Sequence, residues 1–205
     1  MIKIQVSEVE MGILDSTYIR CVLSDGSKFL SKEGYRIPSL EENARLRIQE
    51  GKDSIITKYG NWVTSCYVNI PGKGEFLTKY PMVTANAKYA TDRHENRKRI
   101  YLTDQQVEQV LLDCIEIERQ TIPTNKFNDN NITYYLFLES AEKYGLFLED
   151  WGIKQLNIFP PKGDYAQNKS KAFVVPTWFA GLTYNQSELS HWNLCSGNYV
   201  VLGVK

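Results

Sequence analysis

The chain has 205 residues, of which 42% are hydrophobic, and its 24 basic residues are balanced by 24 acidic ones. This size and composition are typical of a globular protein with one large domain or two small ones. A net charge of zero disfavours a protein that binds nucleic acid over its whole surface, and no apolar run reaches the roughly 18 residues of a membrane span.

The N-terminus and the cysteines both predict an intracellular protein. Residues 1–14 lack the basic start and continuous apolar block of a signal peptide. The four cysteines (Cys21, Cys66, Cys114 and Cys195) are far apart in the sequence, which favours buried thiols over disulfides. We therefore expect a cytoplasmic location, meaning the host cytoplasm or a virion if a phage encodes the protein.

The start of the chain predicts β-strands. Polar and apolar side chains alternate over residues 2–6, as in a half-buried strand. Asp25 and Gly26 are a typical pair for a tight turn, so residues 18–23 and 28–30 are expected to form a hairpin around them.

A helix is predicted to follow these strands. Ser39 and Glu42 have the spacing of a capping box, and Gly51 is a typical residue for ending a helix. The apolar face of this helix is narrow, so we expect it at the surface, lying on a sheet.

More strands are predicted up to residue 80. Residues 54–59 and 62–70 have the composition of strands. Pro71 and Gly72 suit the central positions of a type II turn that leads into a third strand at 75–80. Residues 82–99 follow neither the two-residue period of a strand nor the 3.6-residue period of a helix. We interpret them as a long loop or arm, a kind of segment that is often functional.

The clearest helical pattern covers residues 103–120. Thr103 and Gln106 form a second capping box, and Pro123 ends the element. Apolar residues recur along it at three- and four-residue steps, at Val107, Val110, Leu111, Cys114 and Ile117. We expect this helix to be the centre of the core, with Leu111 and Cys114 buried.

The elements after this helix give mixed signals. Residues 121–131 are polar and turn-rich, and they mark a possible weak boundary within a single domain that covers 1–205. Residues 132–144 combine strand-like composition with helical spacing, and we interpret them as a helix, in preference to a strand, with Gly145 as its cap. Residues 160–171 are expected to form an exposed loop.

The last third of the chain predicts strands. Pro176 lies between apolar residues at 173–175 and 177–179, which favours an edge strand or a bulge. Residues 199–204 are nearly all apolar, which predicts a strand covered on both faces. Together these elements predict an α+β fold. In it, antiparallel sheet from the N- and C-terminal thirds packs on a few helices, the main one at about 103–120.

One segment concentrates positive charge. Residues 88–99 contain five basic residues and Tyr89, which are able to contact phosphates and to stack on a nucleotide base. The alternative is a solvated loop in which Asp92 and Glu95 offset part of the charge, and the neutral chain favours this alternative. The phosphate-binding candidates are Lys88, Arg93, Arg97, Lys98 and Arg99.

Few residues suit catalysis. Only His94 and His191 are available as histidine bases, and Cys66 or Cys195 is the candidate nucleophile for them. His191 and Cys195 are four residues apart, but no second pair supplies the remaining ligands of a zinc site. The motifs of phosphate-binding loops, dinucleotide sites and serine hydrolases are missing from the sequence. We therefore assign no catalytic residue, no metal ligand and no cofactor.

Aromatic residues make up 12% of the chain, and many lie in its last third. Tyrosine and tryptophan are favoured at protein interfaces, where one end of the side chain is buried and the other meets a partner. An aromatic-rich core is the alternative interpretation. The candidate interface residues are Trp178, Phe179, Trp192 and Tyr199.

These observations favour a non-enzymatic structural or interaction protein that binds protein partners or copies of itself. Its basic residues are 16 lysines and only 8 arginines, a bias typical of AT-rich genomes, and our leading hypothesis is a subunit of a larger assembly such as a phage virion. A nucleic-acid-binding accessory protein that uses residues 88–99 is the second hypothesis. A small hydrolase or nuclease with an unrecognised site is the third.

Overall fold

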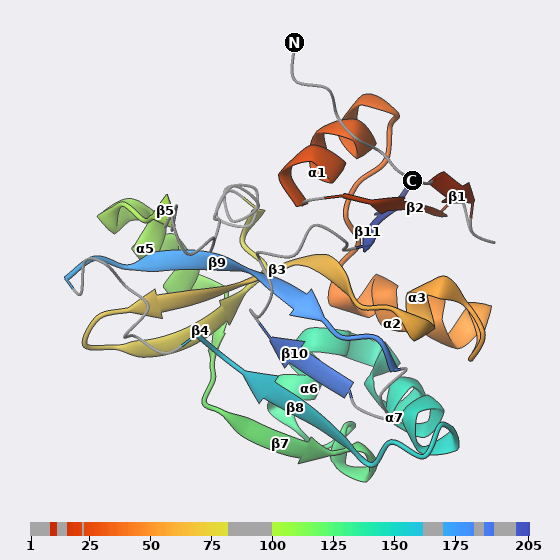
Figure 1. Cartoon of the computed structure of the whole chain (residues 1–205). Coiled ribbons are helices and arrows are strands. Elements are labelled where there is room, and N and C mark those ends of the chain that lie inside the picture. The colour runs from red at the N-terminus through yellow and green to blue at the C-terminus, as the bar shows by residue number, and fades with distance from the viewer. Residues whose placement is uncertain are drawn as a thin grey trace.

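The structure is a computed structural model that describes residues 9–11, 16–21, 23–81, 100–161, 170–182, 187–190 and 200–205. Its centre is one large sheet with helices on both faces (Figure 1). The strands are β1 (Val9–Met11), β2 (Ser16–Arg20), β3 (Asn61–Ile70), β4 (Gly74–Thr78), β5 (Ile100–Tyr101), β6 (Cys114–Glu116), β7 (Gln120–Pro123), β8 (Gln155–Phe159), β9 (Phe173–Phe179), β10 (Ser187–Ser190) and β11 (Val200–Val204). The helices are α1 (Leu23–Lys32), α2 (Leu40–Glu50), α3 (Ile55–Lys58), α5 (Asp104–Leu112), α6 (Asn131–Phe137) and α7 (Ala141–Asp150), with the short 3-10 helices η1 (Thr124–Lys126) and η2 (Leu138–Ser140).

The sheet brings the two ends of the chain together. Its main path runs β1-β2-β11-β3-β9-β10-β8-β7, and β4, β5 and β6 branch from it. Most neighbouring strands are antiparallel, whereas β8 with β10 and β3 with β11 are parallel. The predicted α+β fold, with sheet from the N- and C-terminal parts, is therefore confirmed. The two parallel pairs were not predicted.

The inner face of the sheet carries the main core. Alternation along β9 places Phe173, Val175 and Phe179 on this face. There they cluster with Phe137 of α6 and Tyr144 of α7, and α2 adds its own apolar residues to the same cluster. The inner face is thus closed by α2, α6 and α7.

The outer face is covered at two places by described helices. α1 packs over β2, β3 and β11, where Leu30 meets Trp62 and Val201. α5 packs near the other end of β3 and β9, where Val110 meets Cys66 and other apolar residues. Within the described residues, no helix covers the outer side of β7, β8 and β10 (Figure 1).

Predictions from local sequence chemistry are confirmed. Ser39 is the N-cap of α2 with both bonds of its capping box, and the helix ends at Gly51. The turn after β3 has Gly72 at φ 75°, and the Lys73 amide donates to the Ile70 carbonyl at 2.9 Å, as a type II turn requires. Pro176 lies in β9 beside a register shift in β3, so the predicted bulge is present.

The predicted central helix is wrong in its length and its role. α5 begins after Thr103 as expected but ends at Leu112, and Cys114–Glu116 pairs with β4 as strand β6. The apolar residues of this segment also fit a two-residue period, so pairing with β4 decided its conformation. Leu111 and Cys114 are only partly buried, and Val110 is the buried residue of α5.

Two strands predicted in the first third are helices. The residues around Asp25 form α1, in which Gly26 lies so close to β11 that a Cβ there would be 2.8 Å from Val201 Cγ2. Residues 55–58 form α3, which Ser54 caps and whose Ile56 is fully buried. Packing against β11 and its neighbours overrode the local strand and turn propensities.

Three further expectations concern helix ends and the burial of segments. The helix predicted at 132–144 is confirmed as α6 followed by η2 and α7, but Gly145 lies inside α7 and does not cap a helix. α2 keeps an exposed side, but its buried side is wider than the narrow apolar face that was expected, because Asn43 and Arg47 are fully buried. Pro160 and Pro161 are also buried, in contrast to the exposed loop expected there.

The strands predicted at 62–70, 75–80 and 199–204 are present as β3, β4 and β11, whereas other predictions fall outside the described residues. The strand expected at 2–6, the arm at 82–99 and most of the loop at 160–171 belong to this part of the chain. Within the described residues, no helix has the length and apolar character needed to cross a membrane.

Candidate functional site

The outer side of β7, β8 and β10 presents aligned polar and aromatic side chains. Leu156 and Ile158 of β8 are buried on the inner face, so alternation turns the residues between them outward. The strand register places Asn157 beside Thr121 of β7 and beside Glu188 of β10. We call this surface the open face, and its residues are Arg119, Thr121, Gln155, Asn157, Phe159 and Glu188.

Asn157 is the best-oriented polar group of the open face. Its Oδ1 accepts hydrogen bonds from Thr121 Oγ1 at 2.9 Å and from Gln155 Nε2 at 3.3 Å. These bonds orient the carboxamide, and its Nδ2 group has no acceptor among the described residues. Because β8 is paired on both sides, this donor is held on a rigid strand and is available to a ligand.

An arginine–aromatic pair forms one end of the open face. The Arg119 guanidinium lies 4.7 Å from the centroid of the Phe159 ring, a cation–π contact. Arg119 is exposed and forms no ion pair with another described residue. Stacking leaves the in-plane N–H groups of a guanidinium available, so Arg119 is able to bind a carboxylate or another anion.

A second aromatic residue, Trp178 of β9, lies on the outer face two strands away from Phe159. Phe159 is paired in register with Ser190, and Ser190 with Trp178. Trp178 is partly exposed and contacts Trp62 in an edge-to-face pair with ring centroids 5.1 Å apart. Trp178 therefore borders the open face, and its role at an interface stays a prediction.

Of the other predicted site residues, Phe179 alone is among the residues that the structure describes, and it does not join this surface. Phe179 is fully buried on the inner face, where the Arg47 guanidinium lies 4.0 Å from its ring centroid. Trp192 and Tyr199 lie outside the described residues, as does the whole basic group of Lys88, Arg93, Arg97, Lys98 and Arg99. The sequence interpretation missed Arg119, Asn157 and Phe159, although the alternation of QLNIF at 155–159 was a signal for Asn157 and Phe159.

The described thiols are poorly suited to nucleophilic chemistry. Cys21, Cys66 and Cys114 are free, and the first two are buried. Burial, with a smaller contribution from the charge of Asp25, raises the pKa of Cys21 to about 11. Burial also raises the pKa of Cys66. Since the thiolate is the reactive form, these groups are inert at neutral pH.

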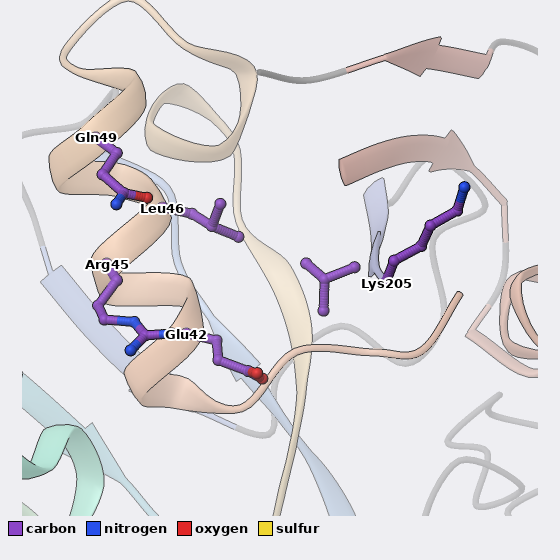
Figure 2. A pocket seen from close by; sticks show the side chains of 6 residues that line it. Glu42, Arg45, Leu46, Gln49 and Lys205 are labelled. Carbon is purple, nitrogen blue, oxygen red and sulfur yellow. The ribbon is translucent and has the colours of Figure 1, made fainter. Parts of the chain in front are cut away.

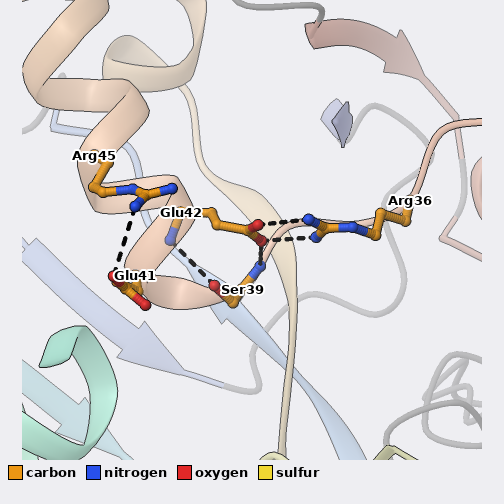
Figure 3. A network of polar contacts seen from close by, with 5 residues as sticks. All are labelled: Arg36, Ser39, Glu41, Glu42 and Arg45. Atoms are coloured by element: carbon orange, nitrogen blue, oxygen red, sulfur yellow. Dashed lines mark hydrogen bonds and ion pairs between the residues drawn. The ribbon is translucent and has the colours of Figure 1, made fainter. Parts of the chain in front are cut away.

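A second polar arrangement lies at the start of α2 (Figure 3). Glu42 accepts two hydrogen bonds from Arg36, at 2.8 and 2.6 Å, and one from the Ser39 amide at 2.8 Å. The hydrogen bonds from Arg36 contribute most to lowering the pKa of Glu42, which falls to about 2. One turn along the helix, Arg45 lies 3.9 Å from Glu41. Among the described residues, no group of three or more His, Cys, Asp and Glu side chains is placed to hold a metal ion.

Comparison with known proteins identifies the fold. No family model matches the chain, and no curated protein matches its sequence. A solved structure does match. Its description reads "Accommodation of massive sequence variation in Nanoarchaeota by the C-type lectin fold". The two proteins superpose with a TM-score of 0.63 over 99% of this chain and 100% of that chain. This chain has the C-type lectin fold. With 13% sequence identity, the similarity establishes the fold alone.

Proposed function

We propose that the chain is a non-enzymatic recognition protein whose open face binds a protein partner. The observation that carries the proposal is the alignment of Asn157 with Thr121 and Glu188 across three paired strands, next to Arg119 stacked on Phe159. Arginine and aromatic residues dominate binding hot spots, and rigid strands hold such groups more accurately than loops do.

The fold supports a role in recognition. In the structurally similar protein from Nanoarchaeota, the C-type lectin fold accommodates massive sequence variation. A scaffold of this kind separates two tasks, since buried residues maintain the sheet while outward residues are free to differ. The same division is seen along β8, where Leu156 and Ile158 are fully buried and Asn157 and Phe159 are partly exposed.

The chemistry of the open face defines its partner. The Arg119 guanidinium favours an acidic group on the partner, and the Nδ2 group of Asn157 is able to donate to a carbonyl or carboxylate oxygen. A protein surface with an acidic side chain near an exposed backbone carbonyl meets both needs. Assembly into a larger particle such as a phage virion is one form of this recognition. That form remains a prediction, as does nucleic-acid binding by residues 88–99.

Site-specific crosslinking tests the proposal. A photo-crosslinking amino acid is placed at Asn157, and in a matched variant at Lys143, an exposed residue of α7, in cells that naturally make the protein. We expect one protein to be attached from position 157 and not from position 143. Arg119→Ala should then weaken binding of that purified protein by about 30-fold, as expected for a hot-spot residue.

Several results would overturn the proposal. They are equal attachment from both positions, attachment of nucleic acid or polysaccharide alone, and unchanged affinity in Arg119→Ala. Attachment of a second copy of the chain would support it, with self-assembly as the form of recognition.

A further inference from the structure

A hollow of about 400 Å³ lies between α2 and the end of β11 (Figure 2). This volume is in the range of small-molecule sites. The hollow lies against α2, the helix that covers the inner face, so it is separate from the open face. The residues that line it are Glu42, Arg45, Leu46, Gln49, Val204 and Lys205.

The floor of the hollow is apolar and firmly packed. Leu46 and Val204 retain 6% and 7% of their exposed area, so each offers a small apolar surface to a ligand. Both belong to a core cluster with Tyr18, Ile56 and Leu202, which fixes their positions. An aliphatic group resting on this floor would be removed from water without disturbing the protein.

The Glu42 side chain, which lines the hollow, is already paired with a cation. Both oxygens of Glu42 accept hydrogen bonds from the Arg36 guanidinium, and one of them also accepts from the Ser39 amide (Figure 3). Its pKa of about 2 reflects these bonds, the largest contribution being the hydrogen bonding to Arg36. Glu42 is therefore a poor partner for a cationic ligand.

The remaining polar groups are donors. Arg45 and Gln49 are one helical turn apart and lie along the same side of α2, and Lys205 lies across the hollow from them (Figure 2). The Arg45 side chain is 58% exposed, and its distance of 3.9 Å to Glu41 is too long for a hydrogen bond. The Lys205 ammonium lies 5.0 Å from the centroid of the Tyr35 ring, a cation–π contact, so Arg45 is the cation best placed to meet a ligand in the hollow.

We propose that this hollow binds a carboxylate that carries a short aliphatic body. The carboxylate accepts hydrogen bonds from the Arg45 guanidinium and the Gln49 amide nitrogen, and the aliphatic body rests on Leu46 and Val204. A planar guanidinium matches a carboxylate in two parallel hydrogen bonds, which favours this anion over a cation or a neutral group. Both a free organic acid and the end of a peptide chain offer this chemistry.

Ligand-observed and protein-observed NMR at pH 7 test the proposal. The probes are isocaproate and its uncharged analogue isocaproamide, together with a blocked dipeptide ending in leucine and its amide. We expect saturable binding of the acids, at least about tenfold weaker binding of the amides, and shifted signals confined to residues around the hollow. Tighter binding of the dipeptide acid than of isocaproate would assign the site to peptide ends, and the reverse order would assign it to free acids.

Matched variants separate this site from general attraction to positive charge. Arg45→Gln removes the proposed anchor at an exposed position and should weaken binding of the acids about tenfold or more. Lys143→Gln removes an exposed positive charge from α7, at a residue that does not line the hollow, and should leave the affinity unchanged. The proposal is refuted if the acids do not saturate, if acids and amides bind equally, or if the two variants behave alike. A native amide spectrum for each variant confirms that its fold is intact.

Discussion

Replacing Gly145 with alanine tests the packing of α7 against η1. In the interior of an exposed helix, alanine is about 1 kcal/mol more favourable than glycine. Gly145 has no positive φ, so conformational freedom is not the reason for a glycine at this position. A Cβ here would lie 2.7 Å from the backbone oxygen of Thr124 and 3.4 Å from Phe127 Cβ. Close approach between the two elements is therefore the reason for the glycine.

The expected cost follows from how firmly Thr124 is held. Its amide donates to the Lys154 carbonyl at 3.0 Å, and its hydroxyl donates to Glu149 at 2.9 Å. The backbone oxygen therefore cannot easily move the roughly 0.6 Å needed to reach an ordinary C···O distance of about 3.3 Å. Overpacking of this kind costs about 1 to 3 kcal/mol. After about 1 kcal/mol is subtracted for the gain in helix propensity, Gly145→Ala should destabilise the protein by up to about 2 kcal/mol.

Urea denaturation followed by circular dichroism measures this change, provided that the variants share one m-value. Lys143→Ala and Lys143→Gly provide the control, because Lys143 is an exposed residue of the same helix. There alanine should be more stable than glycine by about 1 kcal/mol. If Gly145→Ala stabilised the protein by a similar amount, the contact between α7 and η1 would be refuted.

Three other predictions concern buried and charged groups. The pKa of Glu42 is about 2, below its ordinary value of 4.5, so its ion pair with Arg36 stabilises the protein above about pH 4.5 and is lost as the pH falls from there toward 2. Glu42→Gln should cost about 1 kcal/mol at pH 7, for a partly exposed pair, and almost nothing near pH 2, and a pH-independent cost in denaturation experiments would contradict this. Tyr144→Phe removes the hydroxyl oxygen that accepts from Arg47 Nη1 at 3.0 Å and should cost about 1 to 3 kcal/mol in urea denaturation, so an unchanged midpoint would argue against the bond. Cys66 should be alkylated by iodoacetamide only as fast as the protein unfolds, and peptide mass spectrometry showing rapid labelling of the native protein would contradict its burial.

The features that sequence analysis predicted correctly are those that depend on neighbouring residues. The capping box at Ser39 and the turn at Gly72 form because their partners lie within three residues. The end of α5 was missed because the residues after Leu112 fit a strand as well as a helix. Their conformation was decided by β4, whose Leu77 pairs with Ile115.

The open face was missed for a similar reason. Arg119 was assigned to a long helix, so its position opposite β8 could not be inferred. Asn157 and Phe159 lie in residues 147–159, whose sequence pattern indicates no single element. Their alignment with Thr121 and Glu188 depends on a register set by strands far apart in the sequence.

The sequence by itself determined the local chemistry of this protein and its class, with helix caps, a glycine turn, alternating strands and an α+β fold. Only the tertiary structure decided which side chains face inward. Arg47 shows the physical reason. An amphipathic pattern assigns such a charged residue to water, since burying an uncompensated charge is costly. In the folded chain, Tyr144, 97 residues away, accepts a hydrogen bond from Arg47, and Phe179 offers both its carbonyl and the face of its ring. This compensation comes from distant residues, so no local pattern could have predicted it.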